Sequence, residues 1–175
     1  MEVWDLYQEE RIKTEQTMIR GEAQPEGVFR QVVHVCIFNE KGEMLIQQRQ
    51  PFKKGWSNMW DVTVGGSAVS GDTSRSAAER EVLEEIGHQI SLENVRPALT
   101  INFPGGFDDY YLVQEEIDIN TLKLQEEEVQ AVKWASLNEI LDKIEEGMFI
   151  PYHKSFIELM FFMRNHRGTH TRHER

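Results

Sequence analysis

Cysteine is almost absent from this chain: Cys36 is the only one among 175 residues. An intramolecular disulfide is therefore excluded. No apolar run approaches the ~18–20 residues that a membrane-spanning helix needs. The first residues, MEVWDLYQEER, lack the basic and apolar regions of a signal peptide. From this absence of address signals we expect a cytoplasmic protein with no membrane partner.

Positive charge is also scarce. The chain has 19 lysines and arginines against 30 aspartates and glutamates, for a net charge of −11. This balance argues against nucleic acid as a partner and against docking on anionic lipid, since both need a basic face. Phosphorylated small molecules stay possible substrates, because a bound divalent cation inverts the local charge.

Two phosphate-binding signatures are missing, GxGxxG and GxxxxGK followed by Ser or Thr, so the sequence does not indicate a Rossmann or P-loop site. Strand and helix patterns alternate without a regular βαβ repeat, which predicts an α/β fold with a mixed sheet covered by helices. The strands are expected at residues 29–39, 44–50, 59–66, 95–103, 108–118 and 128–136, and the helices at 74–87, 136–147 and 151–165.

The helix expected at 74–87 carries an unusual cluster of acid groups. Glu81, Glu84 and Glu85 stand at i, i+3 and i+4 and therefore share one helix face. Val82, Leu83 and Ile86 are expected to form an apolar stripe about 150° away. Three carboxylates repel one another in a partly dry space. Mg²⁺ would remove that conflict, because it prefers oxygen ligands and shares its shell with substrate phosphates. A solvated acidic surface is the alternative.

The loop before this helix favours the metal interpretation. Gly65 and Gly66 end an expected strand, and Asp72 stands just ahead of the helix, for which Thr73 or Ser74 is the expected N-cap. Glycine allows another group to approach the backbone closely. We therefore place Gly65 and Gly66 among the candidate substrate-binding residues.

The segment from Gly66 to Gly87 resembles the signature of the Nudix hydrolases. That signature is a glycine, five residues, a glutamate, seven residues, and then Arg-Glu-apolar-x-Glu-Glu-x-Gly-apolar. The flanks GEMLIQQR and EEEVQAVKWASLNEI also resemble the family, and EVWDLY and WDVTVGG resemble its branch related to isopentenyl-diphosphate isomerase. The resemblance implies an α/β/α sandwich, with residues 1–165 as a single domain, 1–28 as an N-terminal hairpin extension and 166–175 as a disordered tail.

The same resemblance implies a metal-dependent hydrolase that cleaves the diphosphate linkage of a nucleoside diphosphate derivative or a related organic pyrophosphate. Glu81, Glu84, Glu85 and the carbonyl of Gly66 resemble the ligands of Mg²⁺, with Mn²⁺ as a possible substitute. Arg80 resembles the residue that orients a glutamate through charge-assisted hydrogen bonds. Glu84 or Glu85 is a candidate for the base that takes the proton of the attacking water.

Further candidates lie outside the signature. Glu127 or Glu128, in the run QEEEV, is a second possible base, although charge runs are more often solvated edges. Arg49 resembles a phosphate-facing residue, with an ordinary surface arginine as the alternative. Several aromatic residues are possible stacking partners for a base, although aromatic residues in strands more often pack in a core; they are Trp56, Phe103, Phe107, Tyr110 and Tyr111.

Two positions depart from the signature, and two other functions compete with hydrolysis. Asp72 replaces a glutamate and shortens its reach, and His88 replaces an apolar residue. Isomerase activity is rejected because VTVGGSAV has no cysteine and Cys36 lies in an apolar strand. A nucleotide sensor without catalysis usually loses part of the glutamate cluster, which is complete here. The N-terminal hairpin and the apolar last helix are candidate surfaces for a homodimer.

Overall fold

The computed structural model describes residues 1–166 and 168–170. Residues 167 and 171–175 fall in the predicted disordered tail, so that part of the prediction lies outside the described residues. Within the described residues, no helix has the length and apolar character needed to span a bilayer.

The described residues form one sheet, three α-helices and a short 3₁₀-helix at Ile119–Thr121. The strands are β1 (Val3–Tyr7), β2 (Lys13–Ile19), β3 (Phe29–Phe38), β4 (Met44–Arg49), β5 (Trp60–Asp61), β6 (Val64–Ser67), β7 (Leu99–Phe103), β8 (Gly106–Gln114) and β9 (Val129–Ala135). The helices are α1 (Ser74–Ile86), α2 (Leu137–Glu145) and α3 (Lys154–Met163).

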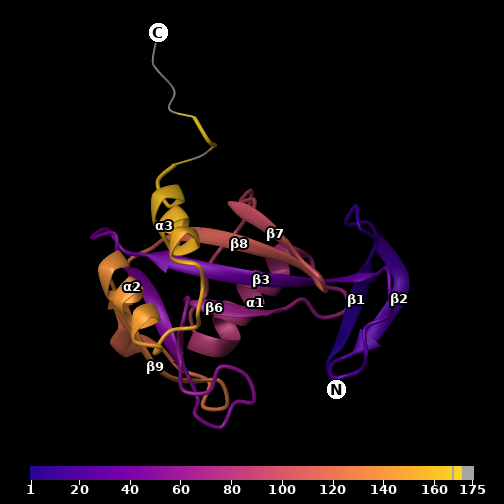
Figure 1. The fold of residues 1–175 in the computed structure, drawn as a ribbon, viewed down its shortest axis with the longest axis horizontal. Coiled ribbons are helices and arrows are strands. Elements are labelled where there is room, and N and C mark those ends of the chain that lie inside the picture. The colour runs from indigo at the N-terminus through magenta and orange to yellow at the C-terminus, as the bar shows by residue number, and fades with distance from the viewer. Residues whose placement is uncertain (167, 171–175) are drawn as a thin grey trace.

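Strand β3 is the centre of the sheet (Figure 1). One of its edges pairs in parallel with β8 from Arg30–Gly106 to Phe38–Gln114, and the other pairs antiparallel with β6. Strand β4 meets β3 only at Phe38–Met44 and then diverges to pair with β9 and β5. The sheet therefore contains parallel and antiparallel pairs, as its sequence pattern predicts.

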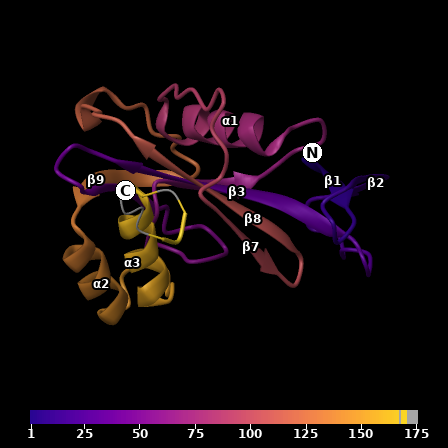
Figure 2. The same cartoon turned by 90° about the horizontal axis from the view of Figure 1, so that it is seen from above.

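Helices cover both faces of the sheet (Figure 2). Helix α1 packs on one face over a core that includes Val35, Val64 and Val82. Helices α2 and α3 pack on the other face over a core that includes Phe38 and Phe161, whose rings meet edge to face. This arrangement confirms the predicted α/β/α sandwich with a mixed sheet.

The prediction of a single strand at 59–66 is wrong, because the structure has two short strands there. The chain forms β5 beside β4, crosses the gap between the diverging strands, and forms β6 beside β3. Thr63 lies at the crossing and bridges the gap, because its hydroxyl accepts the Ile37 N–H (2.9 Å) and donates to the Leu45 carbonyl. Because the strand is interrupted at Thr63, Gly65 and Gly66 lie on β6 beside β3, and Gly66 lies against Glu81 of helix α1.

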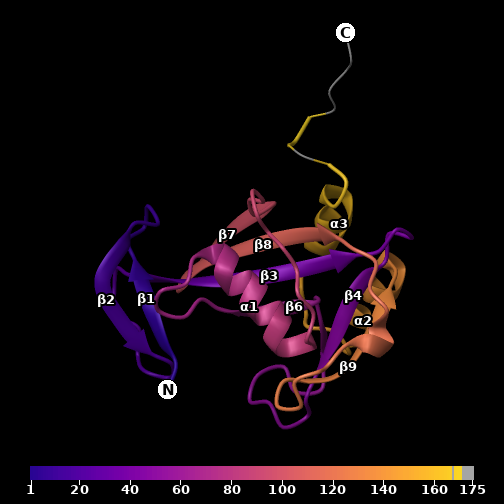
Figure 3. The ribbon, with the colours of Figure 1, turned by 180° about the vertical axis from the view of Figure 1, so that it is seen from behind.

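The N-terminal hairpin is present as predicted, with β1 and β2 antiparallel at one end of the sheet (Figure 3). Trp4, Leu6 and Met18 form a small apolar cluster of their own. Strand β1 pairs with the start of β3 at Leu6–Arg30, so the hairpin is an extension of the central strand. This position brings the hairpin close to the loop that precedes α1.

Candidate active site

Helix α1 starts and ends on signals that are local in the sequence. Thr73 is the N-cap and forms a reciprocal capping box with Ser76, and Gly87 ends the helix in a left-handed conformation with φ of 65°. Val82 and Ile86 are buried against the sheet as expected. The prediction that Leu83 shares this stripe is wrong. Leu83 lies outside the arc of the helix that faces the sheet, and it is 53% exposed.

A cavity of about 400 Å³ opens between α1, β6, the loop after β4, the loop before β9 and the N-terminal hairpin. It is called the acidic cavity here because five of its lining side chains are glutamates. Those glutamates are Glu2, Glu81, Glu84, Glu85 and Glu128. The cations that line it are Arg20, Arg49, Lys53 and Arg80.

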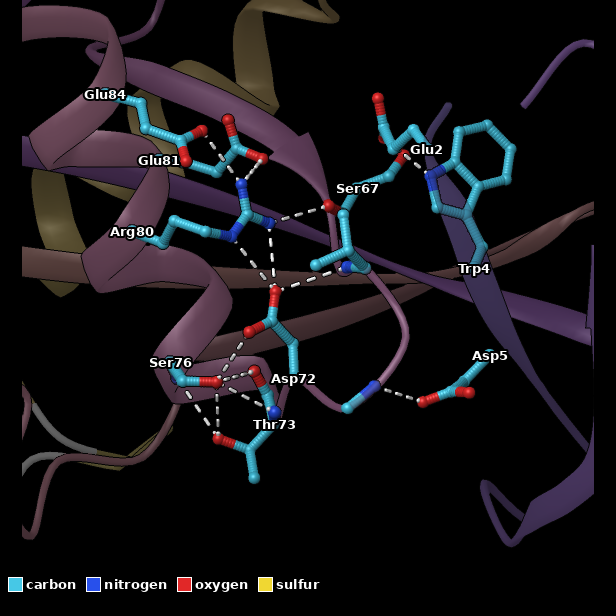
Figure 4. Close-up of polar contacts among 12 residues, drawn as sticks. Glu2, Trp4, Asp5, Ser67, Asp72, Thr73, Ser76, Arg80, Glu81 and Glu84 are labelled. Atoms are coloured by element: carbon cyan, nitrogen blue, oxygen red, sulfur yellow. Dashed lines mark hydrogen bonds and ion pairs between the residues drawn. The ribbon is translucent and has the colours of Figure 1, made fainter. Parts of the chain in front are cut away.

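Arg80 holds the acidic face of α1 together (Figure 4). Its Nη1 donates to Oε1 of Glu81 at 2.9 Å and to Oε2 of Glu84 at 3.0 Å. Its Nε and Nη2 donate to Oδ2 of Asp72 at 3.1 and 2.9 Å. Nη2 also donates to the Ser67 carbonyl at 3.1 Å. The positive guanidinium thus offsets the repulsion between Glu81 and Glu84.

The two departures from the signature have clear structural places. Asp72 reaches Arg80 despite its shorter side chain, and it also accepts from the Ser76 hydroxyl at 3.0 Å, which ties it to the first turn of α1 (Figure 4). His88 lies beyond the end of α1, and its Nε2 is 2.8 Å from Oε1 of Glu115. Asp72 therefore keeps its link to Arg80, and His88 does not enter the acidic cavity.

Gly65 and Gly66 form a thin wall because consecutive residues of a strand face opposite sides of the sheet. A Cβ on Gly66 would lie 2.2 Å from Cδ of Glu81, inside the acidic cavity. A Cβ on Gly65 would lie 2.6 Å from Nδ1 of His34, on the other side. Both positions therefore need glycine, since any side chain would displace one of these two groups.

Glu85 is the most deeply buried carboxylate of the acidic cavity, at 6% exposed. Its Oε2 accepts from Nε2 of Gln47 at 2.9 Å, the only side-chain hydrogen bond that it makes with the described residues. Burial raises the pKa of Glu85 to about 8, although the bond from Gln47 acts in the opposite direction. Burial also raises the pKa of Glu81, against the influence of Arg80. These carboxylates are costly to ionise without a cation nearby.

Residues 28–159 match the model of the NUDIX domain. The chain belongs to the Nudix hydrolase family. It is 46% identical to an uncharacterised Nudix hydrolase of Listeria innocua and 44% identical to one of Listeria monocytogenes, and each match covers 97% of this chain and 99% of the relative. A crystal structure of a Deinococcus radiodurans protein shares the fold, with a TM-score of 0.71, 23% identity, and coverage of 91% of this chain and 97% of that one.

An isopentenyl-diphosphate isomerase of Shigella flexneri is a more distant relative of this Nudix hydrolase. It is 26% identical over 62% of this chain and 63% of its own. The thiol that the sequence lacks near Gly65 is not supplied from elsewhere, because Cys36 is fully buried with its Sγ 3.9 Å from the sulfur of Met160.

The fit of a divalent cation to this Nudix hydrolase rests on its donor set. Within the described residues, no three acidic, histidine or cysteine side chains are grouped as metal ligands, and Arg80 binds Glu81 and Glu84. The candidate metal ligands are nevertheless all carboxylate or carbonyl oxygens, the kind of ligand that Mg²⁺ prefers. Gly66 lets the Glu81 carboxylate lie directly against the backbone of β6, and Glu85 has capacity for further bonds. The residues therefore fit a hard cation.

The other predicted residues divide between the cavity and the surface. Glu128 lines the acidic cavity and pairs there with Lys53, whereas Glu127 is exposed and does not line it. Arg49 lines the cavity, and its Nε donates to the Gly55 carbonyl at 3.2 Å. Of the two candidate bases in the run QEEEV, only Glu128 therefore stays a candidate.

Sequence reasoning missed several cavity residues. Glu2 and Arg20 reach the acidic cavity from the N-terminal hairpin and pair at 2.8 Å. Asp5 joins that hairpin to the loop before α1, because it accepts the Gly71 N–H and the Ser70 hydroxyl, each at 2.8 Å. No local pattern announces these contacts, since they join segments about 65 residues apart. The fold alone also brings Gln47 to Glu85 and Lys53 to Glu128.

A second cavity, of about 480 Å³, lies on the Gly65 side of the wall and is called the side cavity here. Of the predicted aromatic residues, it is lined by Trp56, Phe103 and Tyr110. Phe107 and Tyr111 are buried; the Phe107 ring packs on Phe29 at 5.6 Å, and the Tyr111 hydroxyl meets that of Ser74 at 3.0 Å. Phe107 and Tyr111 therefore do not line this cavity.

Proposed function

We propose that this Nudix hydrolase is a divalent-cation-dependent pyrophosphohydrolase that cleaves the diphosphate linkage of a nucleoside diphosphate derivative or a related organic pyrophosphate. The observation that carries the proposal is the acidic cavity itself. Three glutamates of α1 face it beside a glycine wall, and Arg20, Arg49 and Lys53 line it as well. Oxygen ligands and cations in one cavity suit a metal-bound diphosphate.

In this proposal Glu81, Glu84, Glu85 and the Gly66 carbonyl would hold Mg²⁺, or Mn²⁺ in its place. When bound, the ion would supply charge neutralisation at the phosphates and a more acidic water. Arg80 orients Glu81 and Glu84 through its Nη1. It is anchored in turn by Asp72, so the loop and the helix act together in placing these carboxylates.

The remaining residues bind substrate and move the proton. Arg49, with Gly65 and Gly66 beside it, would bind the phosphates, and Lys53 and Arg20 would add positive charge once their glutamate partners yield. A carboxylate takes the proton of the attacking water, for which Glu84, Glu85 and Glu128 are the candidates. Because the hairpin lines the same cavity as the signature helix, we also propose that residues 1–165 work as one domain.

A hydrolysis assay tests the proposal, in which phosphate release is measured directly for simple diphosphates and after an added phosphatase or pyrophosphatase for substrates that yield phosphomonoesters or pyrophosphate. The panel holds nucleotide sugars, dinucleotides, nucleoside di- and triphosphates and isopentenyl diphosphate, each with Mg²⁺, with Mn²⁺ and with a chelator. We expect release from at least one of these diphosphates that stops when the chelator is added. Release that continues in excess chelator contradicts the metal dependence. Tight binding without release from any compound favours a sensor.

A further inference from the structure

The side cavity continues the acidic cavity around the glycine wall. The two cavities share Arg49, Gly65, Gly66 and Ser67 among their lining residues. A molecule whose diphosphate lies in the acidic cavity would therefore extend its remaining part into the side cavity. The volume of about 480 Å³ falls in the ordinary range of small-molecule sites.

The walls of the side cavity suit a flat ring. The ring of Tyr110 stacks on His34 with centroids 4.6 Å apart and planes 9° from parallel. The guanidinium of Arg30 lies over the Phe103 ring at 5.5 Å. Trp56 lines the cavity and is 52% exposed. Aromatic and guanidinium planes of this kind stack on nucleobases in a way that tolerates different base types.

Asp61 supplies the polar feature that selects among such rings. The residue lines the side cavity and is only 6% exposed. Its Oδ1 accepts from the Tyr152 hydroxyl at 2.9 Å and from the Val62 N–H at 2.8 Å. No described residue donates to its other oxygen, Oδ2. A carboxylate oxygen without a protein donor has capacity for a further hydrogen bond, so a ligand that donates there gains binding free energy.

Burial raises the pKa of Asp61, against the influence of the nearby His34 and the bond from Tyr152, and a donor placed at Oδ2 would favour the ionised form. An apolar chain in the side cavity would remove the remaining water from Asp61 and offer no hydrogen bond in return. A carbonyl facing Oδ2 would set two acceptors against each other. An amino group satisfies the carboxylate.

We propose that Asp61 is a specificity-determining residue that selects a nucleobase with an exocyclic amino group for the side cavity. This inference rests on the proposed function and names the class of its substrate, an amino-bearing nucleoside diphosphate derivative. The Tyr152 hydroxyl and the Val62 N–H both occupy Oδ1, which leaves Oδ2 for the base.

Asp61→Asn tests the inference sharply, because it reverses the group offered to the ligand. The asparagine oxygen must stay at the Oδ1 position to accept from the Val62 N–H. Its amide nitrogen, a donor, therefore takes the place of Oδ2. The probes are the non-cleavable α,β-methylene diphosphates of cytidine and uridine and of adenosine and inosine, pairs that differ by an amino or keto group.

Binding of each probe is measured by calorimetry in the presence of Mg²⁺. We expect the wild type to bind the amino member of each pair about tenfold more tightly, the size of one hydrogen bond to a charged group. In Asp61→Asn the order should reverse. Equal binding of both members by the wild type, or an unchanged order in Asp61→Asn, would overturn the inference.

Two further variants guard against misfolding. Tyr152→Phe keeps the carboxylate and should keep the preference for the amino member, and its loss would overturn the inference. Asp142→Asn, at an exposed position of α2, is the matched control and should bind as the wild type does. Phosphate release from the cleavable diphosphates is recorded separately. If none is released, the proposed function fails while the order of binding still decides the role of Asp61.

Discussion

Two buried carboxylates of this protein have nearly the same exposure and opposite surroundings. Asp109, on β8, is 1% exposed and accepts at Oδ2 from Arg11 (2.7 Å) and Ser74 (2.6 Å), and at Oδ1 from Thr100 (2.6 Å). Glu85, on α1, is 6% exposed and has a single side-chain donor among the described residues, Gln47. Burial alone therefore does not distinguish a structural acid from a functional one.

The number of donors makes the distinction. Asp109 joins the β1–β2 turn, the start of α1 and strand β7, and its bonds leave little capacity for a ligand. Glu85 borders a cavity and keeps capacity for more bonds. A protein tolerates such an incompletely bonded acid where a ligand completes its bonding. Asp61, with one oxygen bonded and one open, belongs with Glu85 in this comparison.

The largest expected effect separates Glu85 from Asp109 by activity. Glu85→Gln should lower cation-dependent phosphate release about 10³-fold, as loss of a metal-bound or proton-accepting carboxylate does. Its free energy of unfolding should stay the same or rise, because a poorly compensated buried acid is removed. Glu158→Gln, at an exposed site on α3, is the control. Full activity in Glu85→Gln would contradict its place in the site.

The glycine wall offers the next test. Gly66→Ala places a methyl group 2.2 Å from Cδ of Glu81 and must displace that carboxylate. We expect release to fall about 100-fold, the usual result of a misplacement of about 1 Å. Gly55→Ala is the matched control, since a Cβ there meets no atom within 4 Å. Equal rates in the two variants would show that Glu81 does not need its position.

Asp109→Asn should have the reverse profile. One of its oxygens becomes a donor that faces groups which themselves donate, so the free energy of unfolding should fall by about 2 kcal/mol. The kcat for phosphate release should change little, because the residue does not line either cavity. Urea unfolding and steady-state kinetics measure the two quantities. A large loss of kcat with unchanged stability would remove the distinction between Asp109 and Glu85.

The smallest effect concerns pH. Burial raises the pKa of Asp61 above that of an unfolded aspartate, so the folded protein binds the extra proton. Its contribution to the free energy of unfolding is therefore full at low pH. That contribution falls as pH rises above about 4, by at most about 1.4 kcal/mol per pH unit. Asp61→Asn should flatten this part of the urea-unfolding profile. An equal slope in the variant would contradict the raised pKa.

The sequence predicted the elements whose causes are local. The helix expected at 74–87 has its N-cap at Thr73 and ends at Gly87, and each of these signals lies within a few residues of the helix end that it sets. The Nudix signature placed Glu81 on the correct helix by the same kind of short spacing. Such features can be read from the sequence because the interacting groups are neighbours along the chain.

The remaining features depend on contacts that no short pattern encodes. The break at Thr63 follows from the divergence of β3 and β4, and Leu83 is exposed because of how α1 lies on the sheet. Glu2 and Arg20 reach the acidic cavity from the N-terminal hairpin, far from α1 in sequence, and Gln47 reaches Glu85 from β4. The sequence therefore identified the centre of the candidate site and missed most of its rim.

The position of Glu2 at that rim has a practical consequence for handling the protein. Its carboxylate is fixed by Trp4 at 2.6 Å and Arg20 at 2.8 Å, so residues added ahead of it emerge beside the acidic cavity. A polyhistidine tag placed there would bring imidazoles and chelated nickel next to Glu81 and Glu84. Helix α3 lies across the sheet from α1 (Figure 2), which makes the carboxyl end the better place for an affinity handle.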